Sequence, residues 1–121
     1  MQDLEIQLKK FQKELSAGTV ALVLLSVLGQ AEEPMYGYQI AKRLERGGEG
    51  FLSGKQSALY PVLRSLDGAG LLASEVEPSV SGPPRRYYRI TEQGRELLQA
   101  WTANWQSTRD FVDNVLQGTA R

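Results

Sequence analysis

The segment Ser53–Leu66 carries polar and basic side chains at spacings that could read nucleic acid. Its larger apolar residues recur every three or four positions, the pattern of one buried helix face, so the polar residues lie on the other faces. Ser53 favours a helix start because its hydroxyl can cap the first free N–H groups. In the first turn of such a helix, glutamine can pair with adenine and lysine with guanine. The candidate contacts are Ser53, Lys55, Gln56, Ser57, Tyr60 and Arg64.

A second basic cluster follows a loop rich in glycine and proline. Leu72–Glu77 and Arg85–Thr91 have the composition of two β-strands. The loop between them ends in Gly82-Pro83-Pro84, directly before Arg85 and Arg86. Two guanidinium groups beside a hairpin tip can contact backbone phosphates. Each segment alone has an ordinary alternative: a solvated polar face on a packed helix, and a surface hairpin with incidental arginines.

The local distribution of charge favours contact with nucleic acid, although the total charge does not. The chain has 14 basic and 14 acidic residues, whereas nucleic-acid-binding domains are usually basic overall. Residues 36–64, however, contain five basic and two acidic side chains, and residues 79–95 contain four basic and one acidic. A local basic face matters more for phosphate contact than the net charge of the chain.

Composition excludes several classes of protein. The chain has 121 residues, the size of one small domain, with no cysteine and no histidine. Disulfides, zinc fingers and histidine-based catalysis are excluded, and we expect no catalytic residues, no metal and no cofactor. A serine–lysine or carboxylate enzyme stays open, but no motif supports one. The longest apolar run, Val20–Leu25, is too short to span a membrane and the N-terminus lacks a signal-peptide pattern, so we expect a cytoplasmic protein.

Apolar periodicity predicts five helices, with the hairpin before the last. The first two are Asp3–Ser16 and a more apolar helix that starts near Gly18 and ends at Gly29. The third opens at Glu33-Pro34-Met35, and the fourth is the polar segment described above. Pro61 inside this fourth helix predicts a local bend, because proline removes an N–H and crowds the preceding turn.

The first and last helices carry apolar stripes that suit packing against a second copy of the chain. We therefore expect a mainly α fold with a two-stranded β-hairpin (α+β): a winged helix-turn-helix with N- and C-terminal dimerisation helices. Residues 1–92 would form the winged helix-turn-helix domain with an N-terminal accessory helix. Residues 93–121 would form a C-terminal dimerisation helix packed on the same unit. The stripes are Leu4, Leu8, Phe11 and Leu15, and Leu98, Trp101, Trp105, Val112 and Val115.

Five short blocks form the most specific pattern in the chain: Gly37-Tyr38-Gln39-Ile40, Ala58-Leu59-Tyr60-Pro61, Leu63-Arg64-Ser65-Leu66, Gly70-Leu71-Leu72 and Pro84-Arg85-Arg86-Tyr87-Tyr88-Arg89-Ile90-Thr91-Glu92-Gln93-Gly94. Their order and spacing resemble the PadR family of bacterial transcriptional regulators, in its subfamily with a short C-terminal helix. The resemblance covers roughly residues 17–98. It implies a winged helix, a homodimer and repression relieved by small molecules. It also accounts for Pro61, since the family carries proline in its recognition helix.

The same resemblance carries DNA contacts over onto the two basic segments. Tyr60 and the pair Arg85 and Arg86 match the family's motif. Lys55 and Gln56 lie at variable positions, where the choice of operator would lie. The residues before the second block depart from the usual pattern, which leaves the operator sequence open.

Two tryptophans on the last helix are candidate effector contacts. In multidrug-responsive members of the family, a tryptophan on this helix faces its symmetry mate and flanks a flat ligand. Trp105 falls at the matching place, and Trp101 lies one turn before it. Two aromatic faces across a two-fold axis could hold a small planar aromatic compound by stacking. The alternative is that both side chains simply pack the dimer seam.

The function expected from these residues is sequence-specific DNA binding by a transcriptional repressor. A homodimer would place two recognition helices in successive major grooves of a palindromic operator, and a small planar effector would relieve binding. The alternative is a winged-helix protein-interaction module without DNA binding. Such a module would not need Arg85 and Arg86 beside the basic face of residues 55–64.

Overall fold

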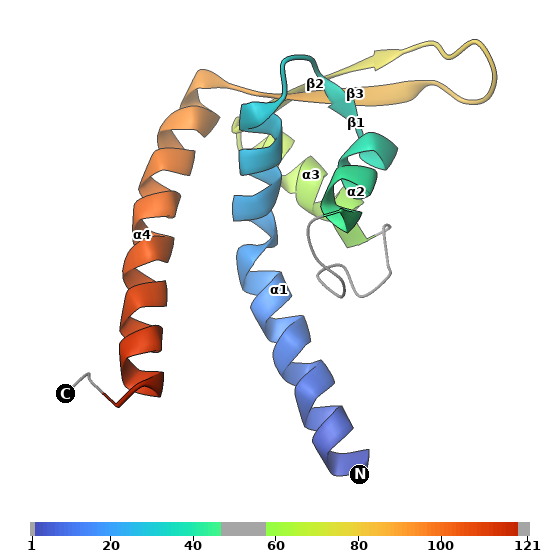
Figure 1. Ribbon diagram of the computed structural model, residues 1–121. Coiled ribbons are helices and arrows are strands. Elements are labelled where there is room, and N and C mark those ends of the chain that lie inside the picture. The colour runs from blue at the N-terminus through green and yellow to red at the C-terminus, as the bar shows by residue number, and fades with distance from the viewer. Residues whose placement is uncertain (1, 47–57, 119–121) are drawn as a thin grey trace.

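The computed structural model describes residues 2–46 and 58–118 and shows two long helices beside a small sheet and two shorter helices (Figure 1). The hairpin formed by the last two strands projects beyond the rest of the protein (Figure 1). This mainly helical architecture confirms the fold class expected from the sequence. The elements are α1 (Gln2–Gln30), β1 (Met35–Tyr36), α2 (Gly37–Glu45), α3 (Leu59–Gly68), β2 (Leu72–Glu77), β3 (Arg85–Ile90) and α4 (Glu92–Leu116).

The first helix is continuous, so the prediction of two helices separated near Gly18 is wrong. The polar residues at this point bond within the helix instead of capping a new one. The Thr19 hydroxyl donates to the Leu15 carbonyl oxygen at 2.9 Å, and the Gln12 amide donates to the Ser16 hydroxyl at 3.1 Å. Gly18 itself has open space around the position of a Cβ, so nothing there requires a turn.

The segment before α2 forms a short strand that the sequence did not predict. Met35 pairs with Tyr88 and Tyr36 pairs with Tyr87, which makes a three-stranded antiparallel sheet in the order β1-β3-β2. The helix expected to open at Glu33-Pro34-Met35 therefore begins later, at Gly37. The Gln39 side-chain oxygen accepts a hydrogen bond from the Tyr36 N–H at 3.0 Å, which satisfies a backbone group at this helix start.

Helix α3 starts so close to Pro61 that no bend is needed. Ala58 is its N-cap, which makes Pro61 the third residue of the helix. An N–H at this position has no acceptor within the helix, so proline costs no intrahelical hydrogen bond. The predicted start at Ser53 lies outside the described residues. At the other end, Gly70 has a φ of +80°, a conformation that glycine adopts without strain and that ends the helix.

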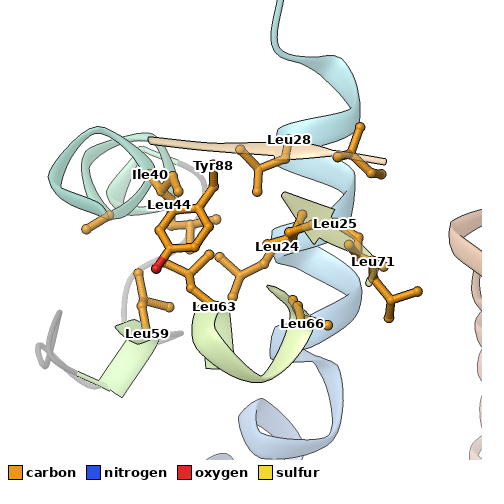
Figure 2. Close-up of a cluster of buried hydrophobic side chains, with 13 residues drawn as sticks. Leu24, Leu25, Leu28, Ile40, Leu44, Leu59, Leu63, Leu66, Leu71 and Tyr88 are labelled. Atoms are coloured by element: carbon orange, nitrogen blue, oxygen red, sulfur yellow. The ribbon is translucent and has the colours of Figure 1, made fainter. Parts of the chain in front are cut away.

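The core lies where the second half of α1 crosses the other elements (Figure 2). Leu24 and Leu25 of α1 are fully buried, and so is Leu63 of α3. The ring of Tyr88 closes the core from the sheet. The other buried residues are Leu28, Ile40, Ala41, Leu44, Leu59, Leu66, Leu71, Leu72 and Ile90.

Helix α1 is also long and apolar enough to cross a membrane, judged by length and composition over Asp3–Gln30. A single helix of this kind is weak evidence, because the core helix of a soluble domain has the same properties. Here Leu24, Leu25 and Leu28 are buried among the other elements of the chain. Their burial explains the apolar composition of the second half of α1 without a membrane.

Helix α4 is fixed to the sheet at its first turn. The Thr91 hydroxyl accepts from the Gly94 N–H at 3.0 Å and so caps the start of the helix. The same hydroxyl lies 2.8 Å from the Gly70 carbonyl oxygen, to which it donates. Gly94 packs on the backbone of Leu71 so closely that a Cβ would lie 2.1 Å from its carbonyl oxygen. The start of α4 is therefore fixed against the base of the hairpin.

Candidate nucleic-acid interface

Four of the predicted DNA contacts line one open hollow of about 520 Å³. Tyr60 and Arg64 come from α3, and Arg85 and Arg86 come from β3. Tyrosines from β1, α2 and β3 complete the lining, so the hollow combines aromatic walls with three guanidinium groups. Its lining residues are Tyr36, Gly37, Tyr38, Tyr60, Arg64, Pro84, Arg85, Arg86 and Tyr88. The predicted contacts Ser53, Lys55, Gln56 and Ser57 lie outside the described residues.

A close approach between α2 and α3 brings Tyr60 into this hollow. A Cβ on Gly37 would lie 2.3 Å from the Tyr60 ring, so only glycine lets the ring lie against the start of α2. Tyr60 still exposes 43% of its surface and can present its hydroxyl to a ligand. Tyr60 is therefore the neighbour that requires a glycine at position 37.

Arg85 and Arg86 lie on opposite faces of the hairpin, because successive side chains of a strand alternate. The Arg85 guanidinium lies over the Tyr36 ring, 4.4 Å from its centroid, in a cation–π contact. Tyr36 in turn packs edge-to-face on Tyr87 at 5.3 Å. Arg85 is also directly opposite Glu77 in the neighbouring strand. The two arginines that the sequence treats as a pair therefore have different surroundings.

Arg86 belongs to a chain of three polar side chains that the sequence did not predict. Its guanidinium donates to the Ser74 hydroxyl at 3.0 Å, and that hydroxyl donates to an Asp67 carboxylate oxygen at 2.5 Å. Asp67 lies in the last turn of α3, Ser74 on β2 and Arg86 on β3. The chain therefore links the C-terminal end of α3 to the hairpin. Strand alternation could have placed Ser74 on the same face as Arg86, but nothing in the spacing points to Asp67.

The buried ring of Tyr88 lies where these charges meet. Burial raises the pKa of the Tyr88 hydroxyl above its ordinary value. The positive charges of Arg86 and Arg64 act in the opposite direction, whereas the negative charge of Asp67 adds to the rise in pKa. A tyrosine hydroxyl is protonated at neutral pH even at its ordinary pKa, and the rise extends this to more alkaline solution, so Tyr88 lines the hollow as a hydrogen-bond donor.

The hairpin as a whole is less basic than strand β3 alone, because strand β2 carries acidic residues. Glu75 and Glu77 of β2 lie directly opposite Tyr87 and Arg85 of β3. Two glutamates therefore accompany the three arginines of β3, and the cation–π contact of Arg85 further occupies one guanidinium. Arg85 lines the hollow together with Arg64 and Arg86, beside the tyrosine side chains. The basic character is concentrated at the hollow rather than along the whole hairpin.

Helix α2 adds groups beside the hollow that the sequence analysis did not select as contacts. Tyr38 is half exposed, and the Lys42 ammonium lies 5.5 Å from the centroid of its ring. Both follow from helical spacing, because residues four apart lie on the same face of a helix. The signal that could have found them is the exposed tyrosine in a block otherwise dominated by core residues.

The two tryptophans of α4 have different surroundings. Trp101 is partly buried and packs against the hydrophobic core, whereas Trp105 is 37% exposed. The structure therefore does not bring them together as two walls of one site within a single chain. Their predicted contact with an effector stays a prediction, and Trp105 is the better placed of the two to meet a second copy.

Comparison with known proteins identifies the family. The Transcriptional regulator PadR-like family matches residues 24–100. The transcriptional regulator Rv3488 of Mycobacterium tuberculosis is 34% identical over 99 residues, which cover 81% of this chain and 86% of that protein. The crystal structure of a PadR family transcriptional regulator from Eggerthella lenta superposes with a TM-score of 0.79 at 34% identity, over 96% of this chain and 97% of that one. A PadR-like transcriptional regulator from Bacillus cereus gives a TM-score of 0.70 at 29% identity, over 86% and 97% of the two chains. The protein therefore belongs to the PadR-like family of transcriptional regulators.

Proposed function

We propose that this PadR-like regulator is a cytoplasmic repressor that binds a palindromic DNA operator as a homodimer. The observation that carries the proposal is the hollow in which Tyr60 and Arg64 of α3 meet Arg86 of the hairpin. Arginine forms paired hydrogen bonds with phosphate, and tyrosine hydroxyls donate to phosphate oxygens. A helix and a hairpin that share one cationic, aromatic surface suit a helix in the major groove with a wing beside it.

The two parts of this surface have separate tasks in the proposal. In the proposal, Lys55 and Gln56 read bases and choose the operator, and Ser53 and Ser57 contribute to these contacts. Tyr60, Arg64, Arg85 and Arg86 hold the DNA backbone and fix the register of the protein on it.

The homodimer is supported by apolar surface that the single chain leaves uncovered. Phe11 of α1 exposes 60% of its surface, and Phe111 of α4 exposes 63%. Exposed apolar side chains along two neighbouring helices favour packing against a second copy. A two-fold axis between the copies would present two α3 helices about 34 Å apart, one turn of DNA.

An effector that enters this dimer would change the distance between the two recognition helices. In the proposal, a small planar aromatic compound stacks on Trp105 and its symmetry mate, with Trp101 beside them. Because the first turn of α4 is fixed to the hairpin base through Thr91, a displacement of α4 would be transmitted to the hairpin. Repression itself would be steric, through occupation of the operator.

The test is a salt titration of DNA binding with single arginine variants. Arg64→Ala and Arg86→Ala each remove two phosphate contacts from a dimer, so the slope of log affinity against log salt should fall by about 2. Arg95→Ala is the matched control, because Arg95 is an exposed arginine at the start of α4 that does not line the hollow and donates to the Gly29 carbonyl oxygen. The DNA is a fragment of the promoter of the protein's own gene that carries an inverted repeat. Unchanged affinity and slope in both variants would contradict the proposal.

A further inference from the structure

The chain of hydrogen bonds from Asp67 through Ser74 to Arg86 has a fixed direction. A serine hydroxyl has one proton, and in this structure it is aimed at the Asp67 carboxylate at 2.5 Å. The lone pairs of the same oxygen are then left for the Arg86 guanidinium, which donates to it at 3.0 Å. Asp67 thus sets the orientation of the hydroxyl, and the hydroxyl sets the position of the guanidinium.

These hydrogen bonds restrain an arginine that lies on an exposed hairpin. Arg86 is exposed to solvent, and a long side chain of this kind samples many rotamers unless something holds it. Ser74 and Asp67 are both half-buried, so they form a firm support at its base. One hydrogen bond uses only part of the guanidinium, which has five N–H donors. The remaining donors stay available to a ligand in the hollow.

Asp67 also reduces an electrostatic cost of this site. Arg64 and Arg86 both line the hollow, and both act on the Tyr88 hydroxyl together with Asp67. Two guanidinium groups at one rim repel each other before any anion arrives. The Asp67 carboxylate, which is linked to Arg86 through the Ser74 hydroxyl, offsets that repulsion and favours the position in which Arg86 stays near the hollow.

We propose that Ser74 and Asp67 are positioning residues that hold Arg86 in place before DNA arrives, so that α3 and the hairpin present a pre-formed site for a phosphodiester of the DNA backbone. This inference rests on the proposed function and adds to it. The ligand class follows from the chemistry of the hollow, since guanidinium and tyrosine hydroxyl groups are donors that suit phosphate oxygens. Ordering the side chain in advance removes an entropic cost from binding.

A double-mutant cycle on DNA binding tests the positioning role. Ser74→Ala should weaken binding roughly two- to tenfold for each protomer, the cost of ordering one long side chain. In the Arg86→Ala background the same substitution should have no effect, because its target is gone. Ser74→Thr retains the hydroxyl and should restore wild-type affinity. Ser79→Ala is the matched control, since it removes a hydroxyl that bonds to Ser81 within the same hairpin, and its effect should be additive with Arg86→Ala.

The same variants identify the ligand group and separate this inference from the proposed function. Loss of affinity by the same factor on operator and unrelated DNA supports a phosphate contact, whereas a loss confined to the operator overturns it. If the wild-type protein binds DNA and Arg86→Ala weakens binding, but Ser74→Ala is additive with it, the positioning role is wrong and the proposed function stands. If the wild-type protein binds no DNA, the proposed function fails.

A readout without DNA tests the pre-ordering directly. Relaxation of the Arg86 Nε–H group by NMR reports how restricted the side chain is on the picosecond to nanosecond timescale. Ser74→Ala and Asp67→Asn should both increase its motion, while Ser74→Thr leaves it restricted. Equal motion of this group in the wild type and in Ser74→Ala would overturn the inference, even if the variant binds DNA weakly for another reason.

Discussion

The two long helices each consist of an inner half that packs on the core and an outer half that does not. In α1, Leu24 and Leu25 are fully buried, whereas Leu8 exposes 65% of its surface. In α4, Leu98 and Trp101 pack against the core, whereas Phe111 is exposed. Figure 1 shows that both outer halves extend away from the sheet, towards the same end of the protein.

The difference between the halves shows that one apolar stripe can pack within its own chain along one part and remain uncovered by that chain along another. The stripe of α4 keeps three- and four-residue steps from Leu98 to Val115, with the polar Thr108 filling the seven-residue gap between Trp105 and Val112. Its first positions are covered by α1 and the sheet of the same chain, and the later ones are open. Periodicity identifies which face of a helix is apolar, but the covering element is decided by the fold. The homodimer proposed above would cover the outer halves.

The largest loss of stability is expected when a buried side chain in the inner half of α1 is shortened. Leu24→Ala should lower the free energy of unfolding by about 2–5 kcal/mol, because it leaves a cavity in a fully buried position. The matched change in the outer half is Leu4→Ala, where the side chain is 71% exposed within its own chain. Its cost should be smaller and should depend on protein concentration, since it would act through the dimer. Urea denaturation at two protein concentrations measures both, and equal losses in the two variants would remove the distinction between the halves.

A smaller effect, on association of the dimer rather than on unfolding of the chain, is expected from a substitution in the outer half of α4. Trp105→Asp should raise the dissociation constant of the dimer roughly 100-fold, about 3 kcal/mol, because it places a carboxylate in an apolar interface. The single chain should keep its fold, since Trp105 contributes to the surface rather than to the core.

Light scattering and circular dichroism test this difference. The control is Val80→Asp, which introduces the same charge at a fully exposed position in the hairpin loop and should leave the dimer intact. A Trp105→Asp variant that remains a stable dimer would show that the outer half of α4 is not part of the interface.

Much of this fold could be predicted from the sequence because local rules dominate it. Thr91 caps α4 as a threonine before a helix should, and the β2 strand has the bounds that its composition indicated. The strand Met35–Tyr36 could not be predicted, because two residues carry no periodicity and their pairing with Tyr87 and Tyr88 is a long-range contact. The continuity of α1 was missed because Gly18 and Ser16 suggest a helix boundary, and no local signal shows that the hydroxyl groups of Ser16 and Thr19 bond within the helix.

The candidate site was only partly predictable, for a similar reason. Tyr60, Arg64 and Arg86 stand out as polar residues on elements with a clear apolar face. Their supports do not: Ser74 lies in a strand of ordinary composition, and Asp67 is one acidic residue near a helix end. Only the register between β2 and β3 and the turn after α3 bring these two to Arg86. The sequence thus points to the proposed DNA contacts more clearly than to the side chains that support them.

The smallest effect is expected from adding one methyl group to each long helix at a glycine. Alanine favours a helix interior by about 0.5–1 kcal/mol over glycine, so Gly18→Ala should stabilise the protein, since its Cβ would meet open space. Gly94→Ala should instead destabilise it by about 1–3 kcal/mol, because its Cβ would meet the Leu71 carbonyl oxygen and the Ile90 side chain.

The two substitutions should change the stability of the protein in opposite directions, which distinguishes the fixed start of α4 from the open part of α1. Thermal unfolding of the two variants measures both changes. If Gly94→Ala is as stable as the wild type, the first turn of α4 can move away from the hairpin base at little cost. The displacement of α4 would then not be transmitted to Arg86, and an effector at Trp105 would have no route to the DNA-binding surface through this contact. A destabilised Gly94→Ala beside a stabilised Gly18→Ala would support the rigid connection on which that route depends.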